Sequence, residues 1–112
     1  MIQQPTVHKW ALGIMNNLFD IEKKIEINGD NSNILRNVEK IKDWLKEEKI
    51  FYENPLGQKF SETRTDIEAT IIGEGTENLK VVEVIKPIVR YGDSKFSVVV
   101  QKGIVLVESS SI

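Results

Sequence analysis

The spacing of the apolar residues changes once along the chain, near residues 55–57, and this change limits the fold more than any other feature. Before this point, apolar residues recur at alternating steps of four and three, the spacing of a helix that packs along its length. After it they alternate with polar residues, as in a strand with one buried face. We therefore predict an α+β fold, with a helical region over residues 1–54 and a small, mainly antiparallel β domain over residues 55–112.

Two helices are predicted in the first region, on either side of a turn-rich segment at residues 28–32. Asparagine, glycine, aspartate and serine in this segment favour a helix end and a new helix start. The predicted seams are Val7, Ala11, Ile14, Leu18, Ile21 and Ile25 for the first helix, and Ile34, Val38, Ile41 and Leu45 for the second. Helices joined by so short a loop are expected to pack antiparallel, as a hairpin.

The apolar stripe on these helices is wider than a bare hairpin can cover. Trp10, Met15, Leu35 and Trp44 flank the seams and would stay exposed to water. Either the β domain covers them, or a second copy of the hairpin does so in a four-helix bundle, and the pattern alone leaves both alternatives open. The residues expected at such a dimer interface are Trp10, Ile14, Leu18, Val38, Ile41, Trp44 and Leu45.

Roughly four to six short strands are predicted in the second region, too few to stand alone comfortably. Residues 65–72 alternate between apolar and polar side chains, and residues 79–89 form a second β run. Pro87 within that run marks a strand end, an edge or a bulge, because proline has no N–H to donate to a neighbouring strand. Residues 91–94 are typical of a hairpin turn, and Gly103 interrupts the last β segment.

Composition excludes several classes of function. The 112-residue chain carries 15 Lys+Arg against 17 Asp+Glu, a net charge of −2, and so lacks the excess of basic residues that nucleic-acid binding requires. It has no cysteine, which removes thiolate nucleophiles, disulfides and cysteine-ligated metals. No apolar run reaches the length of a membrane span. We expect a cytoplasmic protein with neither a nucleic-acid nor a membrane partner.

Few side chains offer catalytic chemistry. His8 is the sole histidine, and an ordinary place on a helix surface explains it best. Asp66 and Glu68 are predicted on one strand face, where paired carboxylates can bind a hard cation or divide acid and base roles. Lys59 and Arg64 lie nearby and favour a neutralised polar face instead. We expect no catalytic residue, no metal and no cofactor, and keep a small hydrolase or metal-dependent enzyme on this strand as an alternative.

The order of these parts, paired helices and then a small β domain, resembles GrpE, the nucleotide exchange factor of DnaK-type chaperones. Residues 14–18 (IMNNL) are similar to the family's DNL-type motif, and residues 34–50 resemble its second bundle helix. Residues 57–60 (GQKF) match its G-x-x-F motif. The later β segments, residues 81–86 (VVEVIK) and 101–107 (QKGIVLV), are similar to the V-x-E-V strand and to the closing strand. The resemblance is to a short form that lacks the long N-terminal coiled-coil helix.

This resemblance implies a non-enzymatic homodimer whose helical hairpins form a four-helix bundle. Its β domain would bind the open form of the chaperone's nucleotide-binding domain and so promote nucleotide release. By position, Lys95, Val105 and Val107 are the expected partner contacts, with Arg64 and Asp66 on the polar strand face. The alternative on the same fold is a dimeric adaptor that binds another protein and has no exchange activity.

Overall fold

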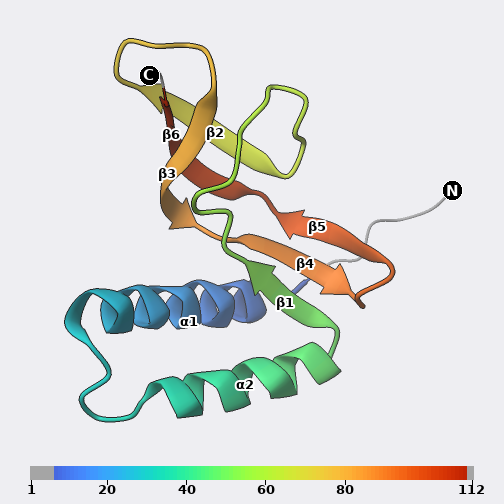
Figure 1. Ribbon diagram of the computed structural model, residues 1–112. Helices are drawn as coiled ribbons and strands as arrows, with labels where there is room; N and C mark the ends of the chain where they lie inside the picture. Colours follow the sequence, from blue (N-terminus) through green and yellow to red (C-terminus); the bar gives the residue numbers. More distant parts are fainter. Residues whose placement is uncertain (1–6, 111–112) are drawn as a thin grey trace, which may run out of the picture.

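The computed structural model describes residues 7–110, in which two helices precede six strands (Figure 1). The prediction of an α+β fold is confirmed. The elements are α1 (Lys9–Asn28), α2 (Leu35–Glu47), β1 (Ile50–Glu53), β2 (Ile67–Ile72), β3 (Leu79–Lys86), β4 (Ile88–Gly92), β5 (Ser97–Gln101) and β6 (Gly103–Ser109). No helix in this described part of the chain is both long enough and apolar enough to cross a membrane.

The two helices lie side by side, and the chain reverses direction between them (Figure 1). Gly29 ends α1: it takes a φ of +82°, which glycine adopts readily, and its N–H donates to the Ile25 carbonyl at 2.7 Å. The carboxylate of Asp30 then accepts hydrogen bonds from the N–H groups of Ile34 and Leu35, at 2.6 and 3.2 Å. These bonds satisfy free donors at the start of α2, so the turn-rich segment separates the helices as predicted.

The second helix ends at Glu47, before its predicted end, and a strand follows at once. Lys49 takes a left-handed φ of +69° and turns the chain into β1. β1 pairs antiparallel with β4, with Ile50 opposite Tyr91. A strand thus lies inside residues 1–54, which the sequence predicted as helical, because isoleucine, phenylalanine and tyrosine in β1 favour a strand once the helical spacing has ended.

The six strands form two three-stranded sheets. The first has the order β1-β4-β5 and is antiparallel throughout; the second has the order β2-β6-β3, in which β6 is antiparallel to β3 and parallel to β2. Pro87 directly follows β3, which agrees with the strand end among the three alternatives predicted for it, and it carries the chain from the second sheet to the first. The chain returns to the second sheet at Gly103, the first residue of β6, where an added Cβ would lie only 2.9 Å from the Ile88 side chain.

Two clusters of buried residues form the core, and α1 contributes to both. One cluster joins the helices to the first sheet and consists of Ala11, Met15, Leu18, Val38, Ile50 and Val89. The other lies on the second sheet and consists of Phe19, Ile67, Leu79, Val81, Val84, Ile88, Val105 and Val107. Tyr52 packs against both clusters, and its ring meets that of Phe19 edge-on at 6.0 Å. The β strands therefore cover part of the wide helical stripe, including Met15.

Candidate functional site

Eight large apolar side chains remain exposed on the helices and at the start of α2, and we term six of them, without Ile27 and Leu35, the outer helical face. These six are Trp10, Ile14 and Ile21 on α1, Ile41 and Trp44 on α2, and Ile34 immediately before α2. The two tryptophans are the most open of the six, with 62% and 64% of their surface exposed.

Part of the outer helical face points away from the sheets, whereas Trp10 lines a small pocket with Ile50 and Tyr91 of the first sheet. Successive residues turn by about 100° around a helix, so Ile21 lies almost opposite Phe19, which is buried on the second sheet. By the same rule Trp44 lies almost opposite Lys42, whose ammonium group is 4.7 Å from the ring centroid of Tyr52 in β1. Both helices therefore carry apolar side chains that the described part of the chain leaves at least 37% exposed.

The structure divides the seven residues predicted at a dimer interface. Trp10, Ile14, Ile41 and Trp44 belong to the outer helical face, and Leu45 is half-buried. Leu18 and Val38, however, are 4% and 2% exposed and pack in the core. Their assignment to an interface is wrong, because the step of four and three marks the whole apolar stripe and does not tell which part of it the sheet covers.

The partner contacts predicted on the last strand are also corrected. Val105 and Val107 are 1% and 0% exposed, because β6 is the central strand of its sheet and is flanked by β2 and β3. Lys95, by contrast, is exposed in the turn between β4 and β5. The Asp93 carboxylate fixes this turn by accepting hydrogen bonds from the N–H groups of Lys95 and Phe96, both at 2.9 Å. Phe96 is 77% exposed beside Lys95.

Arg64 and Asp66, the remaining predicted contacts, lie together in a charged cluster next to β1 and β4. Two parallel hydrogen bonds join them, Arg64 Nε to Asp66 Oδ1 at 3.0 Å and Arg64 Nη2 to Oδ2 at 2.9 Å. Arg90 approaches the same carboxylate at 3.5 Å and also pairs with Glu53. The hydrogen bonds from Arg64 hold the pKa of Asp66 below its usual value. The charges of this cluster thus compensate one another and connect the start of β2 to the first sheet.

A second network of polar side chains holds α1, α2 and β1 together. Tyr52 donates its hydroxyl to Glu22, and Lys42 pairs with the same carboxylate at 3.3 Å. Burial, followed by the neighbouring Glu22 carboxylate, raises the pKa of the Tyr52 hydroxyl. This network fixes the two helices against the first sheet.

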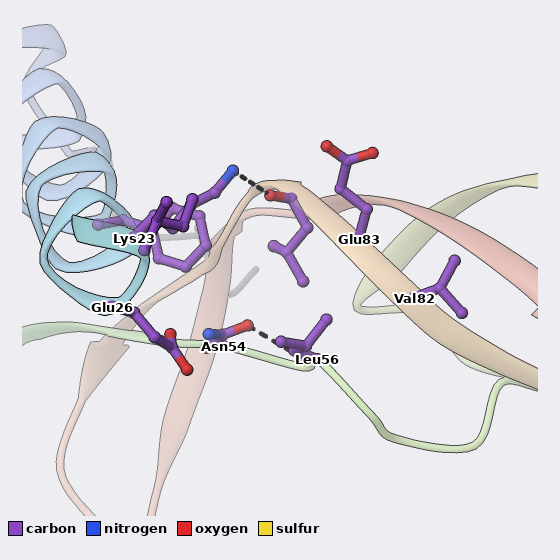
Figure 2. A pocket seen from close by; sticks show the side chains of 9 residues that line it. Lys23, Glu26, Asn54, Leu56, Val82 and Glu83 are labelled. Atoms are coloured by element: carbon purple, nitrogen blue, oxygen red, sulfur yellow. Dashed lines mark hydrogen bonds between the residues drawn. The ribbon is translucent and has the colours of Figure 1, made fainter. Parts of the chain in front are cut away.

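A groove of about 570 Å³ opens between the C-terminal half of α1 and β3 (Figure 2). Its lining consists of Phe19, Lys23, Glu26, Ile27, Asn54, Leu56, Val82, Glu83 and Val84. Lys23 crosses from α1 to β3, where its ammonium group donates to the Val84 carbonyl at 2.9 Å. The sequence pattern did not predict this groove. Val82 and Ile27 could have indicated it, because each is a large apolar residue that falls outside the periodic pattern of buried positions on β3 and α1.

The residues considered for catalysis are engaged elsewhere or isolated. His8 is exposed at the start of α1, where its ring stacks on that of Trp10 at 6.2 Å. Two arginines occupy the carboxylate of Asp66, so it is not free to act with Glu68. Within residues 7–110, no three acidic or histidine side chains come together as a set of metal ligands.

Comparison with known proteins finds no relative of this chain. It matches no protein-family model, no curated protein and no solved structure. The resemblance to GrpE therefore rests on the motifs quoted above and on the order of the elements.

Proposed function

We propose that the protein is a homodimeric co-chaperone that resembles GrpE and promotes nucleotide release from a DnaK-type chaperone without catalysing a reaction itself. The observation that carries this proposal is the outer helical face. A row of exposed apolar residues with a tryptophan on each helix is unusual for a monomer and typical of an interaction surface.

The size of the outer helical face supports pairing with a second copy in a four-helix bundle. Trp10 and Trp44, at their observed exposures, have on the order of 250 Å² per chain to bury, since an aromatic side chain buries about 150–250 Å². This is about a third of the roughly 800 Å² per partner in a standard interface. The four isoleucines of the face add to this area. A two-fold axis would place the same residues opposite one another.

The turn between β4 and β5 supports the role of the β domain as the partner-binding part. Lys95 and Phe96 are exposed there on a backbone that the Asp93 carboxylate holds in place. An aromatic side chain presented with little freedom is a typical anchor of an interface. If this turn binds the open form of the nucleotide-binding domain more tightly than the closed form, nucleotide affinity falls. A tenfold decrease requires about 1.4 kcal/mol of coupling.

The proposal is tested by the rate of labelled ADP release from a DnaK-type chaperone of the same cell. Wild-type protein should accelerate release with saturation. The double variant Lys95→Glu, Phe96→Ala should require about tenfold more protein for the same rate, as expected for loss of an interface anchor. Lys102→Glu, an equal charge change at an exposed position between β5 and β6, should act like wild type.

No acceleration by wild-type protein at any concentration would refute the exchange role. Binding to the chaperone without acceleration would instead fit the dimeric adaptor. Equal effects of Lys102→Glu and of the double variant would show that the turn is not the contact.

A further inference from the structure

We infer that the groove between α1 and β3 binds an extended peptide segment that carries cationic side chains next to apolar ones. This inference goes beyond the proposed co-chaperone function and does not depend on it. It is based on three features of the groove: an open strand edge, an apolar lining, and two carboxylates without a partner in the described chain.

The open strand edge is the half of β3 that follows Val81. Residues 57–60 cover the first half, since Gly57 and Phe60 donate to the carbonyls of Val81 and Leu79, each at 2.9 Å. Residues 82–86 form the second half. Within residues 7–110, they receive a single hydrogen bond from outside the sheet, which the Lys23 ammonium group donates to the Val84 carbonyl. An edge strand with unoccupied backbone groups is the usual docking place for an extended peptide.

The lining beside this edge is apolar and exposed. Ile27, Leu56 and Val82 keep 78%, 49% and 42% of their surface open, although they surround a concave space of about 570 Å³. Phe19 and Val84, which are buried, form the floor. This volume lies within the roughly 300–1,000 Å³ of typical ligand sites. Apolar side chains of a bound segment would remove the three exposed residues from water.

The charges of the groove select a cationic segment. Glu26 on α1 and Glu83 on β3 lie on opposite sides of it (Figure 2), and no ion pair within residues 7–110 engages either. The Lys23 ammonium group pairs with neither carboxylate, because it donates to the Val84 carbonyl and lies 5.4 Å from the centroid of the Phe19 ring. Its single positive charge leaves the lining, which has two carboxylates, with a net charge of −1. Lysine or arginine side chains of a peptide would pair with the two carboxylates, whereas an acidic peptide would be repelled.

The groove is also formed before any segment binds. Asn54 Oδ1 accepts the Leu56 N–H at 3.1 Å, and Pro55 between them is fully buried, so the wall opposite α1 is fixed (Figure 2). Lys23 braces α1 against β3 on the other side. A wall that is already ordered costs little conformational entropy on binding.

The test uses two synthetic peptides, acetyl-Leu-Lys-Val-Lys-Leu-amide and its counterpart with glutamate in place of both lysines. Each is titrated into nitrogen-15-labelled full chain, and backbone amide shifts are followed. The cationic peptide should shift residues 82–84, Glu26 and Leu56, and should bind at least about fivefold more tightly than the acidic peptide. Glu83→Lys or Glu26→Lys should weaken its binding by about fivefold to tenfold.

The matched control is Glu74→Lys, which makes the same change in net charge at an exposed loop position outside the groove. It should leave the affinity within about twofold of wild type. Absence of shifts at the groove, equal affinity for both peptides, or an equal effect of Glu74→Lys and Glu83→Lys would overturn the inference. The ADP-release assay uses none of these variants, so its failure and the failure of this inference are distinguishable.

Discussion

Leu18→Ala should destabilise the single chain strongly, whereas Ile14→Ala, four residues earlier on the same helix, should not. Leu18 is 4% exposed and packs in the core with Met15, Val38 and Val89. Truncating a leucine in such a place removes buried apolar area and leaves a cavity, which costs about 2–5 kcal/mol. Because a domain of this size is stable by only about 5–15 kcal/mol, the loss would be a large fraction of the total.

Ile14 differs because 38% of its surface is exposed. An alanine there leaves an open dent that water fills, so the expected cost in the monomer is about 1 kcal/mol. The measurement is urea unfolding followed by far-ultraviolet circular dichroism, in solutions dilute enough to keep chains apart. In a thermal scan the core variant should melt about 8–20 °C lower, since about 1 kcal/mol corresponds to roughly 4 °C for a chain of this length. Equal costs for the two variants would contradict the division of the helical stripe into a covered and an open side.

Three further predictions concern single groups. Gly92→Ala should lower the free energy of unfolding by more than about 2 kcal/mol, because φ is +138° and an added Cβ would overlap the Phe96 carbonyl oxygen. A thermal unfolding curve equal to that of wild type would contradict this backbone conformation. Since Arg64 lowers the pKa of Asp66, their pairing stabilises the fold above the ordinary aspartate pKa of about 4 and is lost as the pH falls below it. When stability is measured at decreasing pH, Arg64→Ala should make it depend less on pH in this acidic range. An unchanged pH dependence would refute the pairing. Because the pKa of the Tyr52 hydroxyl is raised, its contribution to the free energy of unfolding is fully present below pH 10, about the ordinary tyrosine value, and is lost at higher pH. In a titration followed by phenolate absorbance, Tyr52→Phe should remove a transition that occurs well above that pH. Removal of a transition near pH 10 instead would contradict the burial of Tyr52.

Features that depend on a few neighbouring residues could be predicted from the sequence. The spacing of apolar residues predicted both helices, and the cluster of turn-forming residues around Gly29 and Asp30 predicted the break between them. Pro87 ends β3 because its lack of an N–H is a property of the residue itself. The turn before β5 likewise depends on Asp93 and its nearest neighbours.

Contacts between distant residues could not be predicted in this way. Val105 and Val107 are buried because β6 lies between β2 and β3, and no local pattern encodes the parallel pairing with β2. The groove depends on bulges in β3, where register shifts on either side of Val82 and Ile85 bring both residues out of the regular alternation. Periodicity thus indicated which side chains are apolar, and the tertiary fold decides which of them are covered.

The most direct test of the central claim, that the outer helical face joins two copies of the chain, is sedimentation equilibrium of wild-type protein and Trp44→Glu. Wild type should sediment at twice the chain mass of 12.8 kDa, and Trp44→Glu should sediment as a folded monomer, because a carboxylate would be buried in the pairing surface. Ile27→Glu, an equal change at a 78% exposed position of α1 outside that face, should stay dimeric. A wild type that is monomeric at every concentration, or a Trp44→Glu variant that still dimerises, would contradict the account.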